Sequence, residues 1–374
     1  MKKLFIISAI LLVVVLIFLG IYNFAFKKDA PTTQQIIAPV VDTSKALSGV
    51  KTEKITAISD GGVLGAIMDK KTEEIKYYET STGLVWKMDA EGKGKQRITD
   101  VKVLGLKKVL WSIDASKVLT VTQKEGQNSF YMYDYRTQKG TLLKNGLDTA
   151  VWDNLGTKIF YKYFDNASQK RTMDIANPDG SEWQKIADIT ARNIVIAPVP
   201  LTSLVSYWNA PNASEETQLQ IVGATGGDAK TILSGKYGAD YLWSPDGNKA
   251  LVSSLSSNKN MTLGIVSMDG TYQDLNIPTF VSKCAWSQDG KTVYYALAGG
   301  IPTGANMPND YQENKFNTED TFWKMDIATG KKDRIIETSE INGKYDSSEL
   351  FLSVTEDALY FVNKIDKKLY RLEF

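Results

Sequence analysis

Histidine is absent from this sequence, and cysteine occurs only once, as Cys284. The absence of histidine excludes Ser-His-Asp and Cys-His mechanisms, histidine general bases and most catalytic zinc sites. A single cysteine cannot form a disulfide within the chain, and we interpret Cys284 as a small buried apolar residue in a strand. The composition therefore predicts no cofactor and no metal site, and it favours a binding protein over an enzyme.

A large excess of one charge is also missing. The 374 residues include 44 Lys and Arg and 43 Asp and Glu, which gives a formal net charge of +1. Four of the lysines, at positions 2, 3, 27 and 28, flank the first hydrophobic run, so the rest of the chain is slightly acidic. The sequence has no basic stripe, which argues against nucleic acid as a partner.

The hydrophobic run covers residues 4–26 and contains no charged residue. At a rise of ~1.5 Å per residue, a helix over this run would be ~35 Å long, enough to span a bilayer core. No small-x-small cleavage site follows it, so residues 1–28 are predicted to be an uncleaved signal anchor that contacts the membrane through residues 4–26. A cleaved signal peptide is the alternative. Residues 29–50 are polar and contain two prolines, which is typical of a flexible tether.

The orientation of this anchor depends on nearly balanced charges. Lys2 and Lys3 precede the run and Lys27 and Lys28 follow it, and the free amine at the N-terminus adds one positive charge on the first side. A very short N-terminal stub before a large body also favours an N-terminus inside. We therefore expect a single-pass protein with its body outside the cytoplasm, either periplasmic or at the cell surface. The alternative places the body in the cytoplasm as a membrane-proximal scaffold.

A motif repeats through the remainder of the chain with a period of about 43 residues, which is typical of arrays and propellers. Its clearest copies are Trp-Ser-Pro-Asp-Gly at residues 243–247 and Trp-Ser-Gln-Asp-Gly at residues 286–290. Weaker copies begin at Trp111 and Trp152. With the degenerate copies included, the positions that anchor the repeat are Met68, Trp111, Trp152, Ile196, Trp243, Trp286 and Leu352.

Each repeat contains the same succession of elements. A short apolar strand ends at the anchor, and a turn follows in which Asp bonds the local backbone and Gly adopts a positive φ. Three further strands come next, the first of them aromatic and β-branched, as in residues 159–164. Four strands in one repeat make one propeller blade. The sequence therefore predicts an all-β, seven-bladed β-propeller of four-stranded blades over residues 51–374, with six or eight blades as alternatives.

The two ends of this region complement each other. The last repeat, residues 350–374, has only three strands, whereas residues 54–58 form a strand that belongs to no repeat. We expect residues 54–58 to supply the missing strand. Such pairing would close the ring and hide sheet edges that otherwise promote aggregation.

These turns resemble the repeats of the TolB C-terminal propeller and of the propeller half of prolyl-oligopeptidase-type enzymes. The resemblance rests on the Trp-Ser-Pro-Asp-Gly and Trp-Ser-Gln-Asp-Gly turns and on the Met-Asp-Gly turn at residues 268–270. It implies a propeller fold. It does not imply peptidase activity, because the chain has no Gly-x-Ser-x-Gly motif, no histidine and no hydrolase domain after the repeats.

Candidate binding residues come from the loops between second and third strands, because such loops are held in place by a rigid scaffold. The longest predicted loop, residues 298–320, stretches the spacing between Trp286 and Leu352 to 66 residues. It contains the candidates Pro302, Asn309, Asp310, Tyr311 and Phe316. A second candidate set is Tyr207, Trp208 and Asn209. A plain surface insertion remains the alternative for residues 298–320, and the repeated Trp residues are interpreted as packing between blades.

The sequence thus predicts a membrane-anchored, extracytoplasmic propeller that acts as a non-enzymatic scaffold. Its expected partner is a protein or a cell-surface polymer. The alternative is a carboxylate-based glycan hydrolase or lyase on one face of the propeller, since a pair of carboxylates can perform that chemistry without histidine.

Overall fold

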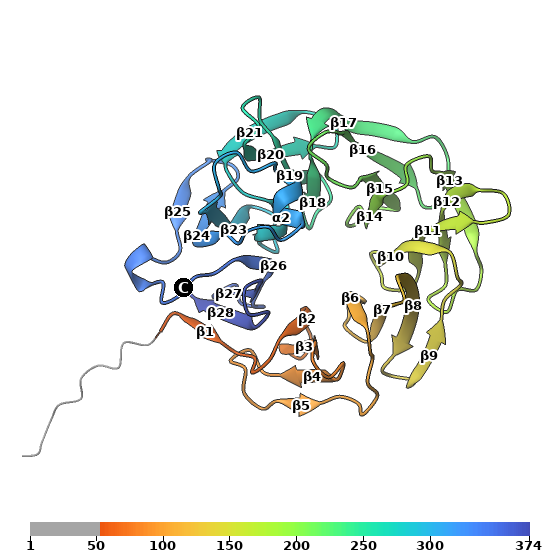
Figure 1. Ribbon diagram of the computed structural model, residues 1–374, viewed down its shortest axis with the longest axis horizontal. Helices are drawn as coiled ribbons and strands as arrows, with labels where there is room; N and C mark the ends of the chain where they lie inside the picture. The colour runs from red at the N-terminus through yellow and green to blue at the C-terminus, as the bar shows by residue number, and fades with distance from the viewer. Residues whose placement is uncertain (1–52) are drawn as a thin grey trace, which may run out of the picture. The chain divides into compact units, whose positions relative to one another are not determined.

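Seven four-stranded antiparallel sheets are arranged in a ring in the computed structural model, which describes residues 53–374 (Figure 1). The number of blades and the number of strands in each blade agree with the prediction from the repeat. The predicted membrane segment, residues 4–26, and the predicted tether, residues 29–50, lie outside the described residues. None of the helices within residues 53–374 has the length and apolar character needed to cross a bilayer.

Six of the blades consist of four consecutive strands. Blade 1 contains β2 (Val63–Asp69), β3 (Glu74–Glu79), β4 (Val85–Met88) and β5 (Gln96–Arg97), and blade 2 contains β6 (Leu106–Trp111), β7 (Lys117–Lys124), β8 (Gln127–Asp134) and β9 (Lys139–Leu142). Blade 3 contains β10 (Leu147–Trp152), β11 (Ile159–Asp165), β12 (Lys170–Ala176) and β13 (Gln184–Asp188). In Figure 1, first strands such as β2, β6 and β10 lie nearest the centre, and fourth strands such as β5 and β9 lie at the rim.

The next three blades follow the same order. Blade 4 contains β14 (Ile194–Pro198), β15 (Leu204–Asn209), β16 (Glu216–Gly223) and β17 (Lys230–Tyr237). Blade 5 contains β18 (Asp240–Trp243), β19 (Lys249–Leu255), β20 (Met261–Ser267) and β21 (Tyr272–Ile277). Blade 6 contains β22 (Cys284–Trp286), β23 (Thr292–Gly299), β24 (Glu319–Asp326) and β25 (Lys332–Arg334). Within residues 53–374, three short helices lie in connections: η1 (Val281–Lys283), α2 (Asn309–Gln312) and η2 (Thr338–Glu340).

Blade 7 combines strands from both ends of the described chain. Strands β26 (Ser347–Leu352), β27 (Ala358–Asn363) and β28 (Leu369–Glu373) are followed at the rim by β1 (Ile55–Ala57). Strand β1 is antiparallel to β28, with Ile55 opposite Leu372 and Ala57 opposite Tyr370. The ring of described residues is therefore closed by a strand from the beginning of the chain, so that blade 7 has four strands like the others.

The turn after each first strand is built from side-chain hydrogen bonds. In blade 5, the Ser244 hydroxyl donates to the Asp246 carboxylate and to the carbonyl of Lys249, 2.8 Å away. Gly247 has a φ of +68°, and a Cβ atom there would lie 2.2 Å from the carbonyl oxygen of Pro200. Blade 6 repeats the Ser-to-Asp bond between Ser287 and Asp289 at 2.7 Å. The Asp and Gly of the motif are thus turn residues, which explains their periodicity.

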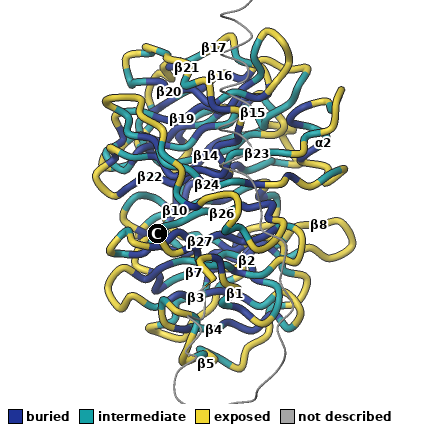
Figure 2. The backbone as a smooth tube through the Cα atoms, turned by 90° about the vertical axis from the view of Figure 1, so that its left-hand side faces the viewer, coloured by how far each residue is buried: buried dark blue, intermediate teal, exposed yellow. Residues whose placement is uncertain are grey.

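The hydrophobic core is divided among the spaces between neighbouring blades. The dark blue, buried strands in Figure 2 lie inside the ring, and the exposed segments are the loops at its edges. One cluster joins Leu119 and Phe130 of blade 2 to Trp152 and Ile159 of blade 3. Corresponding clusters join each other pair of neighbouring blades, including blades 6 and 7 and blades 7 and 1. Each blade is therefore stabilised mainly by apolar contact with its two neighbours.

The repeated tryptophans connect consecutive blades by hydrogen bonds as well as by packing. The indole N–H of Trp152 donates to the carbonyl of Leu110 in β6 at 2.7 Å, and that of Trp286 donates to Leu242 in β18 at 3.2 Å. Trp111 reaches the carbonyl of Gly65 in β2 in the same way, at 2.7 Å. Each of these side chains thus satisfies its single donor in the preceding blade, and its ring is buried at Trp111 and Trp152 and half-buried at Trp286.

One predicted anchor is displaced by two residues. In blade 4 the strand continues past Ile196 to Pro198, which pairs with Val205. The next bond, from the N–H of Val199 to Leu204, corresponds to the bond from Ser244 to Lys249 in blade 5. Pro198 and not Ile196 is therefore equivalent to the tryptophans. The turn that follows lacks the Ser-Pro-Asp-Gly pattern, so the sequence offered no marker for the end of this strand.

Candidate functional site

The most irregular part of the propeller is the insertion, which we define as residues 300–318 between β23 and β24. It is shorter than the predicted 298–320, because β23 continues to Gly299 and β24 begins at Glu319. The insertion lies on the edge of the ring that carries the loops between second and third strands, which we call the loop face. Figure 2 shows its short helix α2 at the right-hand edge of the molecule.

The insertion has an apolar core of its own. Met307 and Tyr311 are 4% and 6% exposed, and they pack with Met261 and Phe280 of blade 5 and its connection. The rings of Phe280 and Tyr311 stack, with centroids 4.5 Å apart and planes inclined by 16°. Burial of two large side chains anchors the insertion to the blades beneath it. Residues 300–318 are therefore an ordered part of the fold.

The insertion also extends over blade 5 to reach blade 4. The side-chain oxygen of Asn309 accepts a hydrogen bond from the N–H of Ala213 at 2.8 Å. Pro308 packs against Gly238, where a Cβ atom would lie 2.7 Å from the Pro308 Cδ. Glycine at position 238 thus permits the close approach of the insertion to the connection between blades 4 and 5.

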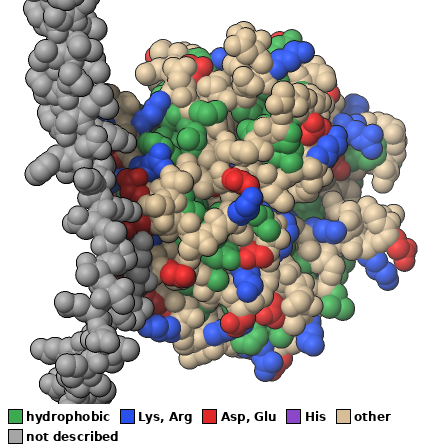
Figure 3. Space-filling model, turned by 60° about the vertical axis from the view of Figure 1, so that its left-hand side comes forward, with side chains coloured by type: hydrophobic (Ala, Val, Ile, Leu, Met, Phe, Trp, Pro, Cys, Tyr) green, Lys and Arg blue, Asp and Glu red, His purple; other side chains and the backbone are tan. Residues whose placement is uncertain are grey.

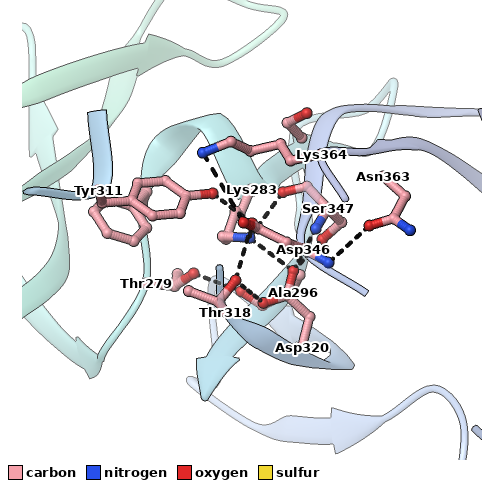
Figure 4. Close-up of polar contacts among 12 residues, drawn as sticks. Thr279, Lys283, Ala296, Tyr311, Thr318, Asp320, Asp346, Ser347, Asn363 and Lys364 are labelled. Atoms are coloured by element: carbon pink, nitrogen blue, oxygen red, sulfur yellow. Dashed lines mark hydrogen bonds and ion pairs between the residues drawn. The ribbon is translucent and has the colours of Figure 1, made fainter. Parts of the chain in front are cut away.

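A buried polar network holds the other side of the insertion (Figure 4). The amine of Lys283 lies 2.7 Å from the carboxylate of Asp320 and 2.7 Å from that of Asp346, and all three side chains are 0% exposed. The same amine donates to the carbonyl of Ser347 at 2.9 Å. Lys283 of η1 thus forms buried ion pairs with Asp320 of β24 and with Asp346, which immediately precedes β26.

Tyr311 connects the insertion to this network. Its hydroxyl donates to the Asp346 carboxylate at 2.6 Å, and the amine of Lys364 lies 3.6 Å from the centroid of its ring. Thr318, at the end of the insertion, donates to Asp320 at 2.7 Å. Figure 4 shows the hydroxyl of Tyr311 pointing toward Asp346. The insertion is thereby joined to blade 7 by a charge-assisted hydrogen bond.

Charges in the network are balanced by their neighbours. Burial alone would raise the pKa of the Asp346 carboxyl, but Lys283 and the Tyr311 hydroxyl hold this pKa below its ordinary value. Burial raises the pKa of Tyr311, and the bond to Asp346 raises it further. Burial lowers the pKa of the Lys364 amine. Asp346 is therefore ionised and Tyr311 is a neutral donor at neutral pH.

A groove of about 1180 Å³ lies beside the insertion on the loop face. One wall is formed by residues 301–307 of the insertion, and the opposite wall by residues 255–261 around the β19–β20 turn. Ala213 and Ser214, from the β15–β16 loop, and Tyr237 complete it on the side of blade 4. Three loops that join second and third strands, in blades 4, 5 and 6, thus meet at one hollow. We take this groove as the candidate functional site.

The lining of the groove is polar but almost uncharged. Lys259 is its single charged residue. Its amide and hydroxyl side chains are Ser214, Ser256, Asn258, Asn260, Thr303 and Asn306. Its apolar residues include Leu255, Ile301, Pro302 and Met307, and Tyr237 is 46% exposed. Such a surface offers hydrogen-bond donors, acceptors and apolar contact at once.

The predicted residues of the insertion fall into different environments. Pro302 lines the groove. Asn309 bonds blade 4, and Asp310 accepts bonds from the N–H of Asn306 and the amine of Lys315, both at 2.7 Å. Tyr311 is buried, and Phe316 is half-buried against it. Four of these five residues therefore shape or anchor the insertion, and Pro302 belongs to the groove itself.

The second predicted set lies in strand β15 and contributes to the fold. Trp208 is 2% exposed, and its indole N–H donates to Asp240 at 3.0 Å. Tyr207 packs at the boundary between blades 3 and 4, and the Asn209 amide donates to the carbonyl of Glu216 at 3.0 Å. We assign Trp208 to the core and not to a binding surface, because its ring has almost no exposed area.

Several residues of the site were not identified from the sequence. Asn258, Lys259 and Asn260 lie in a loop whose sequence carries no motif that would mark it for binding. Lys283 and Asp346 are 63 positions apart, and no local pattern indicates that they meet. Tyr237 ends a strand, and its local sequence carries no motif that would mark it for binding. Only the unusual length of the insertion signalled this region.

Charge does not mark a second site on the face of the propeller that is shown in Figure 3. On the face shown in Figure 3, acidic and basic side chains alternate without an extended area of one sign. Within residues 53–374, no group of three or more Cys, Asp or Glu side chains is placed to hold a metal ion. Asp320 and Asp346 lie close together, but both are fully buried and share Lys283.

No protein-family model matches this chain, and comparison with curated proteins finds no match. Among solved structures, oligogalacturonate lyase from Vibrio parahaemolyticus is similar, with a TM-score of 0.62 and 10% identity over 85% of this chain and 93% of that one. The β-propeller domain of the trilobed protease from Pyrococcus furiosus has a TM-score of 0.52 and 11% identity, over 83% of this chain and 92% of that one. At these identities, the similarity shows a shared fold.

TolB from Acinetobacter baumannii also matches, with 14% identity over 73% of this chain and 62% of that one, at a TM-score of 0.48. The resemblance to TolB rests on the repeated turns. The Pyrococcus furiosus domain is described as having an open velcro topology. In the present chain, by contrast, β1 pairs with β28.

Proposed function

We propose that this protein is a non-enzymatic binding scaffold, which residues 4–26 anchor in a membrane and whose propeller faces out of the cytoplasm. The single observation that carries the binding role is the groove on the loop face. Its walls come from three different loops, and the insertion that forms one wall is fixed at Asn309 and at Tyr311. A preformed groove on a rigid scaffold favours binding, because its loops lose little conformational entropy when a ligand enters.

Orientation and binding are tested separately. For orientation, intact cells are treated with an added protease, and the propeller is followed with an antibody. Loss of the propeller from intact cells is expected. If the propeller is degraded only after the membrane is opened, the body lies in the cytoplasm and the outward orientation is wrong.

Binding is tested by filling the groove. Thr303→Trp adds an indole to the wall of the groove, and Ile113→Trp adds the same group at a residue that is 63% exposed in the β6–β7 turn, at the opposite end of its blade. The full-length protein in detergent is sedimented with the insoluble cell-envelope fraction. We expect Thr303→Trp to weaken co-sedimentation about tenfold, equivalent to ~1.4 kcal/mol, and Ile113→Trp to leave it unchanged. Equal co-sedimentation of both variants would contradict the assignment of the groove.

A second candidate function is a carboxylate-based glycan hydrolase or lyase. It is favoured by Asp240 and Glu349, which lie on the first strands of blades 5 and 7, near the centre of the ring. Desolvation by the surrounding protein raises the pKa of both carboxyls, although Asp240 is half-buried and Glu349 is exposed, and Lys108 on β6 lies within electrostatic reach of both. Carboxyls with raised pKa values can serve as general acids. Glycan cleavage that is lost in both Asp240→Asn and Glu349→Gln would favour this function over the scaffold.

A further inference from the structure

The groove on the loop face has the chemistry of a receptor for an uncharged polysaccharide. We infer that it binds a segment of a neutral glycan, a chain of sugar units that carry hydroxyl or acetamido groups but no carboxylate, sulfate or phosphate. This inference rests on the proposed binding function, and it specifies the class of ligand.

The size of the groove indicates a polymer segment. Its volume of about 1180 Å³ exceeds the range of pockets that enclose single small molecules, ~300–1,000 Å³. The groove is also bounded by separate loops from blades 4, 5 and 6, and not by the walls of one blade. A ligand that fills it must therefore extend across several loops, as an oligomeric chain does.

The polar side chains of the groove are available to a ligand. Six amide and hydroxyl side chains line it, and none of them makes a hydrogen bond to another described residue: Ser214, Ser256, Asn258, Asn260, Thr303 and Asn306. Amides and hydroxyls both donate and accept hydrogen bonds. Sugar hydroxyls and acetamido groups do the same. The groove and a glycan can therefore form hydrogen bonds with each other wherever along its length the repeating chain is bound.

The absence of charge selects against anionic polymers. Lys259 is the single charged residue of the lining, and no arginine occurs in it. Recognition of carboxylates, sulfates and phosphates normally relies on arginine clusters or several lysines. A cationic ligand would find no carboxylate in the lining. The electrostatics of the groove therefore match a neutral ligand.

The apolar part of the lining suits sugar rings. Tyr237 is 46% exposed and lies at the edge of the groove, and Pro278 and Pro302 add further flat apolar surface. A pyranose ring has an apolar face of C–H groups, which can lie against an aromatic ring while its hydroxyls reach polar partners. An extended peptide would instead pair its backbone with an exposed strand edge. The walls here are loops, residues 256–260 and 301–307, and offer no such edge.

The test uses the full-length protein in detergent and isothermal titration calorimetry with three probes: chitohexaose, cellohexaose and hexagalacturonate. We expect at least one of the two neutral hexasaccharides to bind more tightly than hexagalacturonate, with little change between 50 and 300 mM salt, because few charges take part. We also expect Tyr237→Ala and Asn260→Ala each to weaken this binding about tenfold. Tyr131→Ala is the matched control, since Tyr131 is 42% exposed but lines a different hollow, between blades 1 and 2.

The outcomes test two questions separately: whether the groove binds a neutral glycan, and whether it is a binding site at all. If neither neutral hexasaccharide binds, if hexagalacturonate binds more tightly, or if Tyr131→Ala weakens binding as much as Tyr237→Ala, the glycan inference is wrong. If the neutral hexasaccharides fail but Thr303→Trp still reduces co-sedimentation with the cell envelope, the groove binds another class of ligand and the proposed function stands. If both experiments fail, the groove is not a binding site.

Discussion

The turns between first and second strands differ from the loop face in how they are built. Those turns repeat the same design, in which Ser and Asp side chains bond the local backbone, as at Ser244, Ser287 and Asp289. The loop face near blade 6 is formed by an insertion that occurs once and is held by Lys283, Tyr311 and Asp346. The repeat thus specifies the scaffold, and the candidate site lies where the repeat is interrupted.

The two regions are also stabilised by different physical effects. The repeated region depends on turn conformation and on apolar contact between neighbouring blades. The insertion depends on its apolar contacts and, in addition, on a few polar residues whose charges balance one another within the protein interior. Removing one member of such a network greatly lowers the free energy of unfolding, because the remaining partner becomes a buried charge without a counter-ion. Substitutions in the two regions should therefore differ in size and in their dependence on pH.

The largest effect is expected from Lys283→Met. This change keeps most of the side-chain volume but leaves the carboxylates of Asp320 and Asp346 without their shared cation. We expect the free energy of unfolding to fall by ~3–5 kcal/mol, measured by chemical denaturation. Lys331→Met removes an exposed pair with Asp333 and should change stability by less than ~0.5 kcal/mol. Equal effects of the two substitutions would show that the network contributes no special stability.

A somewhat smaller effect is expected from Gly247→Ala in a repeated turn. The φ of +68° disfavours alanine, and its Cβ would lie 2.2 Å from the carbonyl oxygen of Pro200. We expect a loss of roughly 2–4 kcal/mol in the free energy of unfolding. Gly330→Ala is the control, with a φ of +69° but no atom within 4 Å of the added Cβ, and it should cost about 1 kcal/mol. A larger loss in Gly330→Ala would refute the steric explanation.

Tyr311→Phe removes the hydroxyl that joins the insertion to Asp346 and retains the stack on Phe280. The expected loss of stability is about 1.5 kcal/mol, as for a hydrogen bond to a charged group. We also expect faster cleavage by trypsin after Lys315, because the insertion opens more often. Tyr131→Phe, at an exposed position, serves as the control. An unchanged cleavage rate would mean that Tyr311 does not hold the insertion in place.

The smallest effect concerns pH. Burial raises the pKa of Asp240 in the folded protein, so the folded state binds its proton more tightly than the unfolded state does. The stabilisation that this proton provides is complete below the unfolded pKa of about 4 and is lost as pH rises through the folded pKa. Asp240→Asn should therefore be more stable than the parent protein at pH 7, by less than ~1 kcal/mol, with a difference that shrinks toward pH 4. Denaturation curves at several pH values test this, and a difference that grows on acidification would reverse the sign.

Much of the scaffold could be predicted from the sequence because its determinants are local. A turn motif and an alternating strand leave the same signature in every repeat, and the spacing of the copies predicted seven blades. The end of β14 was misplaced because its turn contains no such motif. Ile196 was therefore taken as the anchor when Pro198 holds that position.

The candidate site could be predicted only in part. The unusual length of the insertion drew attention to residues 298–320, and Pro302 does line the groove. Its order could not be predicted, because it depends on contacts such as Lys283 with Asp346 and Asn309 with Ala213, which are distant in sequence. Trp208 was misinterpreted for a related reason. Its partner, Asp240, belongs to the next blade, so the sequence around Trp208 alone did not reveal its burial.

The pairing of β1 with β28 has a consequence for synthesis on the ribosome. Ile55 is among the first residues of the propeller to be translated, but its partner, Leu372, is among the last. Strand β1 therefore remains unpaired while the six intervening blades form. During that interval its exposed edge can promote aggregation. A ribosome that stalls before β28 would release an unclosed ring, and such nascent chains are the ones we expect chaperones to bind.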